Sequence, residues 1–120
     1  MAEHDQRYRP SNHLVRSVDF DRVYRRRATA SDDLLLVFAD RNTQYRPRLG
    51  LSVSRKIGNA VVRNRWKRRL REAFRLNQSS LPQGVDLIVI PRPIDEPPFE
   101  LLTQSLIRLA ARAVRKLPPL

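Results

Sequence analysis

The sequence predicts an α+β fold in which helices pack on a mixed β-sheet to form an α/β sandwich. Two segments are predicted as strands: residues 49–54 alternate apolar with small side chains, and residues 85–90 are almost entirely apolar and β-branched. A long basic helix is expected between them. Because a strand, a helix and a second strand in succession form a crossover connection, the sheet must carry a helix on its face.

Length and composition limit what the chain can be. A chain of 120 residues can bury one hydrophobic core but not two, so we expect a single domain over residues 1–120, with residues 1–12 flexible. The absence of cysteine excludes disulfides and a thiol nucleophile and suits a reducing environment. No apolar run approaches the roughly 18 residues of a membrane span, and the polar N-terminus does not resemble a signal peptide. We therefore expect a cytoplasmic protein.

A short helix is expected to begin at Ser17, which can cap it. Acidic residues in its first turn and three arginines at residues 25–27 match the polarity of the helix dipole. Phe20, Val23 and Tyr24 share one face of this helix. On the residues alone, that face either lies in the core, which is the more usual outcome, or forms an exposed binding surface.

Residues 34–39 form an unbroken apolar run, so both faces of this strand are expected to be covered. The polar residues 40–48 are predicted as a hairpin loop that leads into the strand at residues 49–54. In that strand the small side chains from Gly50 onward share one face. This face is either the floor of a groove for an extended ligand or an ordinary solvent-exposed surface.

The strongest feature of the sequence is the charge of residues 55–75. This segment contains nine Lys and Arg residues and one acid, Glu72, so it carries a net charge of +8 out of +12 for the chain. Gly58 gives conformational freedom at the turn after the strand, and Asn59 can cap the helix that follows.

The basic helix has two different sides. Placed at 100° per residue, its apolar side chains fall within about 120° of one another. This packing stripe consists of Val62, Trp66, Leu70, Ala73 and Phe74, and the opposite side carries Asn64, Lys67, Arg68, Arg71 and Arg75. Like charges one turn apart repel, and only Arg68 has an acid four residues later, so the charge predicts a polyanionic partner. Arg outnumbers Lys by 21 to 3, which favours nucleic acid because guanidinium groups bind phosphate oxygens bidentately.

The C-terminal part of the chain is predicted to be structural. The strand at residues 85–90 ends at Pro91, and a helix is expected to begin near Pro98. From Asn77 onward the chain has five cations and four acids. Apolar residues at spacings of three and four define a core face made of Phe99, Leu102, Leu106, Leu109, Ala113 and Leu117.

No group of side chains in the sequence indicates a catalytic or metal site. His4 and His13 have no ligand partners at suitable spacing, so both are interpreted as surface histidines. The acidic pairs at residues 32–33 and 95–96 are adjacent loop residues, which is more typical of turns and caps than of a two-metal centre. We therefore expect neither a catalytic residue nor a metal ligand in the protein.

Residues 56–72, KIGNAVVRNRWKRRLRE, resemble the signature of the bacterial ribonuclease P protein subunit. That signature is K-x-G-x-A, then R-N-x-x-K-R, then R-E, and the chain matches every fixed position. Residues 14–24 resemble the family's opening helix with its Asp-Phe pair, and residues 85–92 resemble its central strand. The number of fixed residues at fixed spacing makes the resemblance specific.

The resemblance implies a four-stranded mixed sheet with the element order α-β-β-β-α-β-α. Crossover connections are usually right-handed. The family, in contrast, has a left-handed crossover at the basic helix, which periodicity could not indicate.

The resemblance also implies a function. Family members bind the catalytic RNA of ribonuclease P and help it hold precursor tRNA while the 5′ leader is removed, so these two RNAs are the expected partners. The chemistry would belong to the RNA and to Mg²⁺ bound mainly by it, with no requirement for a membrane or for protein oligomerisation. Carried over by position, contacts with the catalytic RNA are expected from Arg55, Lys56, Arg63, Asn64, Arg65, Lys67, Arg68, Arg71 and Arg75.

The leader is expected in a cleft between the first helix and the sheet, beside Phe20, Tyr24 and Phe38. This expectation places the two aromatic residues of the first helix at least partly at the surface, where they can stack on unpaired bases. Tyr24 replaces the usual Phe. Residues 25–27 stand where many members have a glycine-containing turn, which leaves the path out of the helix open.

Two other functions fit the residues. A general RNA-binding or ribosome-associated protein would use the same helix without a role in cleavage. A helix that lies on a membrane surface would need a broader apolar face with exposed aromatic residues, whereas Trp66 and Phe74 are expected to pack internally.

Overall fold

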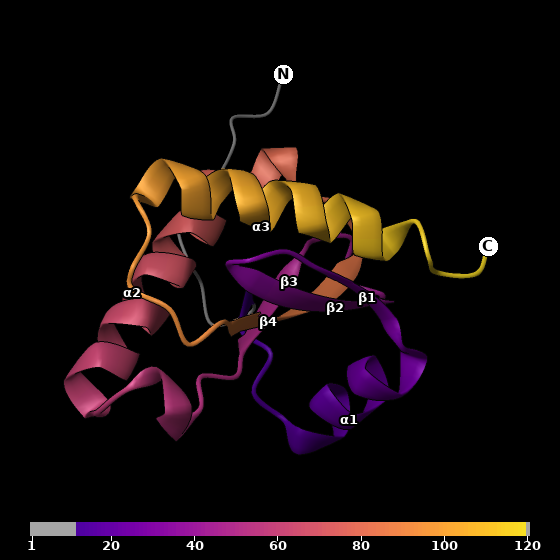
Figure 1. Ribbon diagram of the computed structural model, residues 1–120. Helices are drawn as coiled ribbons and strands as arrows, with labels where there is room; N and C mark the ends of the chain where they lie inside the picture. Colours follow the sequence, from indigo (N-terminus) through magenta and orange to yellow (C-terminus); the bar gives the residue numbers. More distant parts are fainter. Residues whose placement is uncertain (1–11, 120) are drawn as a thin grey trace.

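The computed structural model describes residues 12–119 and shows helices on both faces of one sheet (Figure 1). The flexibility expected of residues 1–12 and the position of His4 therefore lie outside the described residues, except for Asn12, which is buried. The elements are α1 (Ser17–Arg26), β1 (Ala28–Ser31), β2 (Leu35–Arg41), β3 (Arg48–Leu51), η2 (Arg55–Ile57), α2 (Ala60–Leu76), η3 (Gln78–Ser80), β4 (Val85–Pro91) and α3 (Phe99–Val114).

The four strands form one mixed sheet in the order β1-β2-β4-β3. β4 pairs antiparallel with β2 and parallel with β3, while β1 is an edge strand antiparallel to β2. The central position of β4 accounts for its nearly continuous apolar sequence, because helices cover the sheet on both sides of it. The α+β class and the order α-β-β-β-α-β-α are therefore confirmed.

Two details of the sheet differ from the sequence prediction. β1 was not predicted from periodicity, because its four residues ATAS are too short and too small to give a pattern. The segment at residues 40–48 does join β2 to β3, but the predicted hairpin is wrong, since β4 lies between these strands. The hairpin of the fold is instead the one between β1 and β2.

The crossover from β3 through α2 to β4 is left-handed. Val89 faces the α2 and α3 side of the sheet, and its carbonyl oxygen accepts a hydrogen bond from Ser52 N, just beyond β3, at 3.1 Å. In an extended L-residue that runs upward with its side chain towards the viewer, the backbone polar groups point to the right. Seen from the side of α2 with β4 running upward, β3 therefore lies to the right of β4. The chain passes from β3 through α2, in front of the sheet, to β4 on the left. A right-handed crossover would move to the right in this view, so the expected left hand is confirmed.

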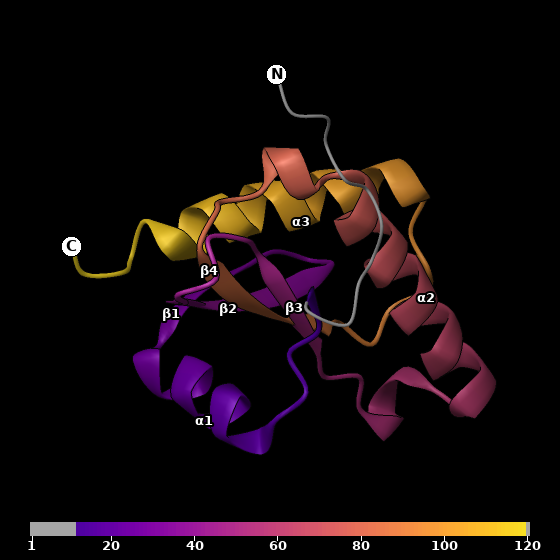
Figure 2. The ribbon, with the colours of Figure 1, turned by 180° about the vertical axis from the view of Figure 1, so that it is seen from behind.

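α2 and α3 together cover one face of the sheet, and α1 lies on the other face, as the two opposite views show (Figures 1 and 2). The main core lies under α2 and α3. Its fully buried side chains include Trp66, Leu70 and Phe74 from α2, Leu102, Leu106 and Leu109 from α3, and Leu35, Val37, Leu87 and Val89 from the sheet. The apolar stripes predicted for both helices are thus confirmed as core.

α1 packs on the opposite face through a smaller cluster. Val23 and Ile88 are fully buried there, and Phe20 lies over Gly50 of β3. A Cβ atom at Gly50 would lie only 2.7 Å from Cζ of Phe20, so a larger residue would force the Phe20 ring to shift. The small side chain at position 50 therefore makes room for the helix and is not the floor of an open groove.

A buried carboxylate fastens α1 to the sheet. Asp86 of β4 is 0% exposed, and its oxygens accept hydrogen bonds from Arg48 Nε and Nη2 at 2.7 Å and from Asn42 Nδ2 at 2.8 Å. Arg22 of α1 donates to the same carboxylate and also to Asp40 at 2.7 Å. The bonds to Asp86 satisfy a charge that would otherwise be costly to bury.

These hydrogen bonds decide the pKa of Asp86. Burial raises the pKa, but the hydrogen bonds from Arg48, Asn42 and Arg22 outweigh burial and leave the pKa below its ordinary value. A carboxylate with a lowered pKa in the folded state stabilises the fold above its unfolded pKa of about 3.9. That contribution is lost as the pH falls through the lower pKa of the folded state.

Replacing Asp86 by Asn tests this anchor. We expect Asp86→Asn to lower the free energy of unfolding at pH 7 by about 3 kcal/mol, because two partly exposed guanidinium groups lose their counter-charge. The difference from the wild type should shrink as the pH falls below about 4. Urea unfolding followed by the fluorescence of Trp66 between pH 7 and pH 3 measures both effects.

Asp33→Asn is the matched control, because Asp33 is exposed in the turn between β1 and β2. Its free energy of unfolding should stay within about 0.5 kcal/mol of the wild type. If Asp86→Asn lowers the free energy of unfolding by the same amount at every pH between 7 and 3, the assigned role of the carboxylate is contradicted.

Candidate nucleic-acid interface

The orientation of α2 follows from its cap and its packing stripe. Asn59 Oδ1 accepts a hydrogen bond from Val62 N at 3.0 Å, which confirms the predicted N-cap. Trp66 and Leu70 are buried against the sheet and α3, so the side of the helix opposite to them faces solvent.

Some of the cations on α2 are already paired with acids. Arg65 and Arg69 lie 3.5 and 3.8 Å from the carboxylate of Glu96, on the side of α2 that faces the segment before α3. Arg75 donates to Glu72 at 3.1 Å through Nε. The i,i+4 spacing suggested that Glu72 would pair with Arg68, but in the structure Glu72 forms its ion pair with Arg75, three residues later.

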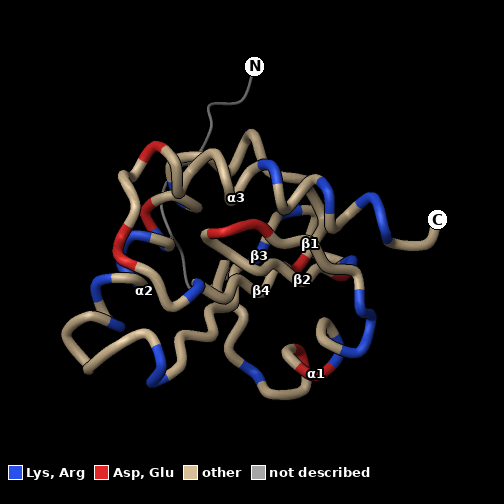
Figure 3. Tube along the Cα trace, viewed as in Figure 1, with Lys and Arg blue, Asp and Glu red and all other residues tan. Residues whose placement is uncertain are grey.

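The remaining cations of this region have no ion pair with any residue in the range 12–119. They are Arg55 and Lys56 of η2 and Arg63, Lys67, Arg68 and Arg71 of α2, with Asn64 exposed among them. We call these seven residues the α2 cationic face. Figure 3 shows the Lys and Arg positions that follow η2 and α2 along one end of the molecule.

Like charges follow one another along the α2 cationic face. Arg63, Lys67 and Arg71 stand at four-residue spacing, so neighbouring charges repel by a few tenths of a kcal/mol each. His13 lies close to this face, and its pKa is lowered by burial and then by the positive charge of Arg71. The predicted surface histidine is thus half-buried, and because its lowered pKa favours the neutral form, it adds no positive charge to this repulsion at neutral pH.

The three expected leader contacts form a second cluster, which we call the aromatic surface. The ring of Tyr24 on α1 lies 5.0 Å from that of Phe38 on β2, edge to face, and 6.3 Å from that of Phe20. All three side chains are half-buried. The structure therefore brings them together and gives them both a packing role and an accessible edge, and their role in binding stays a prediction.

The end of α1 resolves the path of the chain at residues 25–27. The helix ends at Arg26, and Arg27 adopts a left-handed conformation with φ 59°, where its N–H donates to Tyr24 O at 3.2 Å. This is the position where a helix usually has glycine. At the other end Ser17 is the first helical residue rather than the cap, because Arg16 occupies the N-cap position without a side-chain bond.

Asp32, an acid outside these clusters, has a structural role. Asp32 accepts hydrogen bonds from Leu34 N and Leu35 N at 2.8 and 2.9 Å, as expected of a turn residue. Within residues 12–119, no group of three or more His, Asp or Glu side chains could hold a metal ion. In the same range, no helix combines the length and the apolar character needed to span a lipid bilayer.

Two features of this region could not be found from local sequence patterns. The pairing of Arg65 and Arg69 with Glu96 joins residues about one quarter of the chain apart, so helical spacing gives no signal for it. Asp86 stands alone in an apolar strand, and only the folded sheet brings Arg48 to it. A single acid in an otherwise apolar central strand is, however, a signal that a buried cation will be near.

The fold and the charge distribution together define a nucleic-acid-binding protein. The α+β fold presents a helix whose apolar side is buried and whose opposite side carries cations without acidic partners among residues 12–119. This one-sided charge is the electrostatic pattern of a surface that binds a polynucleotide.

Known proteins with similar sequences and folds identify the family. The family model for ribonuclease P matches residues 8–114, and the chain belongs to this family. The ribonuclease P protein component of Brevibacillus brevis is 40% identical over 105 residues, covering 86% of this chain and 83% of that protein. The structure of the RNase P protein from Thermotoga maritima matches with a TM-score of 0.76 at 31% identity, covering 83% of this chain and 96% of that one. That of Staphylococcus aureus matches with a TM-score of 0.73 at 31% identity, covering 88% and 96%.

Members of this family are protein subunits of ribonuclease P, an RNA-based endoribonuclease that acts on precursor tRNA. The chain is therefore a protein subunit of a ribonucleoprotein enzyme, and its RNA partner is the ribonuclease P RNA. The function expected from the resemblance is confirmed at this level. The alternative of a general RNA-binding protein has no support among the similar proteins.

Proposed function

We propose that the α2 cationic face binds the ribonuclease P RNA and that the aromatic surface contacts the 5′ leader of precursor tRNA. The observation that carries the proposal is the set of six cations on η2 and α2 that have no acidic partner among residues 12–119. Their mutual repulsion is relieved when phosphates approach them, so the face is better suited to the complex than to the free protein.

The nine residues expected to contact the catalytic RNA are not equally suited to do so. Arg63, Lys67, Arg68 and Arg71 have no acidic partner among residues 12–119, and the amide of Asn64 can donate a hydrogen bond between them. Arg55 and Lys56 extend the same face at the N-terminal end of α2, where the helix dipole also favours phosphate. Arg65 and Arg75 already lie beside carboxylates, so we assign them a smaller share of the binding.

The proposed mechanism needs no reacting group from the protein. Ribonuclease P RNA and precursor tRNA are both polyanions, and cations between them lower the repulsion that opposes their association. We propose that the catalytic Mg²⁺ ions are bound mainly by RNA. The part left to this chain is to hold the RNA through the α2 cationic face and to orient the leader through the aromatic surface.

The leader is single-stranded, so its bases are free to stack on side chains. The half-exposed edges of Phe20, Tyr24 and Phe38 come from two elements, α1 and β2, that the ion pair between Arg22 and Asp40 holds together. Stacking on such side chains contributes about 1 to 3 kcal/mol per base with little sequence preference. The aromatic surface therefore favours substrates that carry a leader over mature tRNA.

We further propose that the protein acts in the cytoplasm and that its function does not require protein oligomerisation. Both edges of the sheet are engaged within the chain: Leu14 N donates to Leu49 O of β3 at 2.9 Å, and Lys116 donates to Thr29 O of β1. Covered edges disfavour pairing with strands of a second copy.

Arg68→Ala tests the α2 cationic face. If about six phosphates are neutralised, the logarithm of the affinity for ribonuclease P RNA should fall with log salt at a slope of roughly −4 to −5. The substitution should flatten this slope by about one unit, because one phosphate contact is lost. Filter binding at several KCl concentrations measures the slope.

The matched control is Arg112→Ala, which removes the same charge from an exposed position on α3. Its slope should equal that of the wild type. Equal flattening in the two variants would mean that net charge, and not the α2 cationic face, determines RNA binding.

Phe20→Leu tests the aromatic surface, because leucine keeps apolar contact above Gly50 but lacks the ring. We expect the assembled enzyme to bind precursor tRNA with a long leader about 5-fold or more weakly, with an unchanged salt slope. Phe20→Tyr keeps the ring and should bind like the wild type. The role would be rejected if Phe20→Leu weakened binding equally for a substrate whose leader is a single nucleotide.

A further inference from the structure

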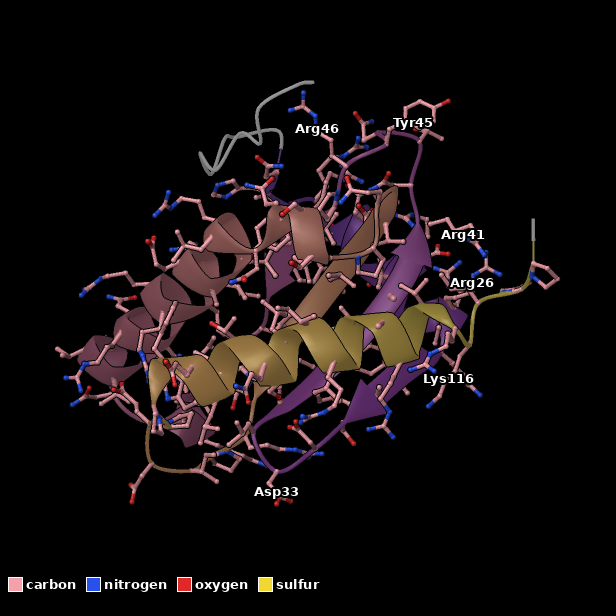
Figure 4. The ribbon with its side chains drawn as sticks, turned by 90° about the horizontal axis from the view of Figure 1, so that it is seen from above. Arg26, Asp33, Arg41, Tyr45, Arg46 and Lys116 are labelled. Atoms are coloured by element: carbon pink, nitrogen blue, oxygen red, sulfur yellow. The ribbon has the colours of Figure 1, made fainter. Side chains whose placement is uncertain are left out.

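The loop between β2 and β3 presents one aromatic side chain that none of the roles above uses. Tyr45 is 86% exposed, more than any other large hydrophobic side chain among residues 12–119. Figure 4 shows it together with Arg46 at the outer rim of the molecule. Burial therefore gives no reason for an aromatic residue at this position.

The backbone at Tyr45 is strained. Its φ is 60°, in the left-handed region, and within residues 12–119 the only other non-glycine residue with positive φ is Arg27 at the end of α1. Glycine and asparagine adopt this conformation easily, whereas a bulky aromatic residue does so rarely. Strain of this kind is found at sites where a side chain is held in place for binding.

The loop is held in this conformation by Asn42. Its backbone N–H donates to Gly84 O at 2.8 Å, and its side-chain Nδ2 donates both to Asp86 at 2.8 Å and to Arg46 O at 2.9 Å. Its Oδ1 accepts from Gln44 N at 2.8 Å. Tyr45 is thus flanked on both sides by residues tied to Asn42, so little conformational entropy is lost when the ring binds a ligand.

The surroundings of the loop are cationic. Arg46 is exposed next to Tyr45, and a hollow between the loop and the start of α1 is lined by Arg16, Arg41 and Arg48. The acid in this lining is Asp19, which lies 3.9 Å from Arg48. An exposed ring with arginines beside it matches a nucleotide, whose base can stack and whose phosphate can pair with a guanidinium.

We propose that Tyr45 stacks on an unpaired base of RNA while Arg46 and Arg16 contact the phosphates next to it. This contact lies on the β2–β3 loop, apart from the α2 cationic face and the aromatic surface, and it rests on the proposed function because it requires RNA to be bound. An apolar protein partner would leave these two arginines without counter-charges, so RNA is the better match. The base belongs either to ribonuclease P RNA or to precursor tRNA.

Three substitutions at position 45 separate stacking from other effects. Tyr45→Ala removes the ring, Tyr45→Gly removes the ring and also the backbone strain, and Tyr45→Phe keeps the ring without the hydroxyl. We expect the Ala and Gly variants to bind RNA about 5- to 150-fold more weakly with an unchanged salt slope, and the Phe variant to bind like the wild type. The melting temperature of the Gly variant should be no lower than that of the wild type.

The measurements use two probes: ribonuclease P RNA from the same genome with the protein alone, and precursor tRNA with the assembled enzyme. If the Ala and Gly variants bind ribonuclease P RNA more weakly, the base belongs to the catalytic RNA. If they weaken only the binding of precursor tRNA by the assembled enzyme, the base belongs to the substrate. If the Ala and Gly variants match the wild type with both probes, the inference is wrong and the proposed function stands. A Phe variant as weak as Ala would also reject stacking, and a wild type that fails to bind ribonuclease P RNA would reject both proposals.

Discussion

The burial of one side of α2 is the constraint on which the binding surface depends. Trp66, Leu70 and Phe74 are fully buried between the sheet and α3, and together they fix the rotation of the helix about its axis. Side chains on the opposite side must then face solvent, whatever their charge. Loss of the Trp66 side chain alone would be expected to destabilise the fold by about 3 to 5 kcal/mol, which shows how strongly this rotation is determined.

The acids of the chain divide its many arginines into two populations. Asp86, Asp40 and Asp19 neutralise arginines that hold α1 on the sheet, and Glu96 neutralises two that face the segment before α3. Each of these pairs stabilises the fold or orients an element. Among residues 12–119, six cations without an acidic partner follow one another on η2 and the open side of α2, while others, such as Arg25 and Arg112, lie elsewhere on the surface. The fold thus gathers on one face charge that is available to a polyanion.

Most of the fold could be predicted because its signals are local. The stripe of α2, the cap at Asn59 and the apolar strand at residues 85–90 all follow from periodicity and capping rules. The short strand β1, the place of β4 between β2 and β3 and the ion pairs of Asp86 depend on residues far apart in the chain, so local patterns could not indicate them. The left-handed crossover was expected only from the family resemblance, and the hydrogen bond from Ser52 to Val89 establishes it. The residues assigned to RNA contacts stay a prediction, supported by the charges that the fold leaves unpaired.

The most direct test of the central claim is to map the RNA that lies against α2. The chain has no cysteine, so Asn64→Cys on the α2 cationic face and Gln104→Cys on the exposed side of α3 each give one attachment point for an iron–EDTA probe. Hydroxyl radicals from position 64 should cut ribonuclease P RNA at a few clustered nucleotides, and those from position 104 should cut at background level. Equal cutting from the two positions, or none from position 64, would contradict the account.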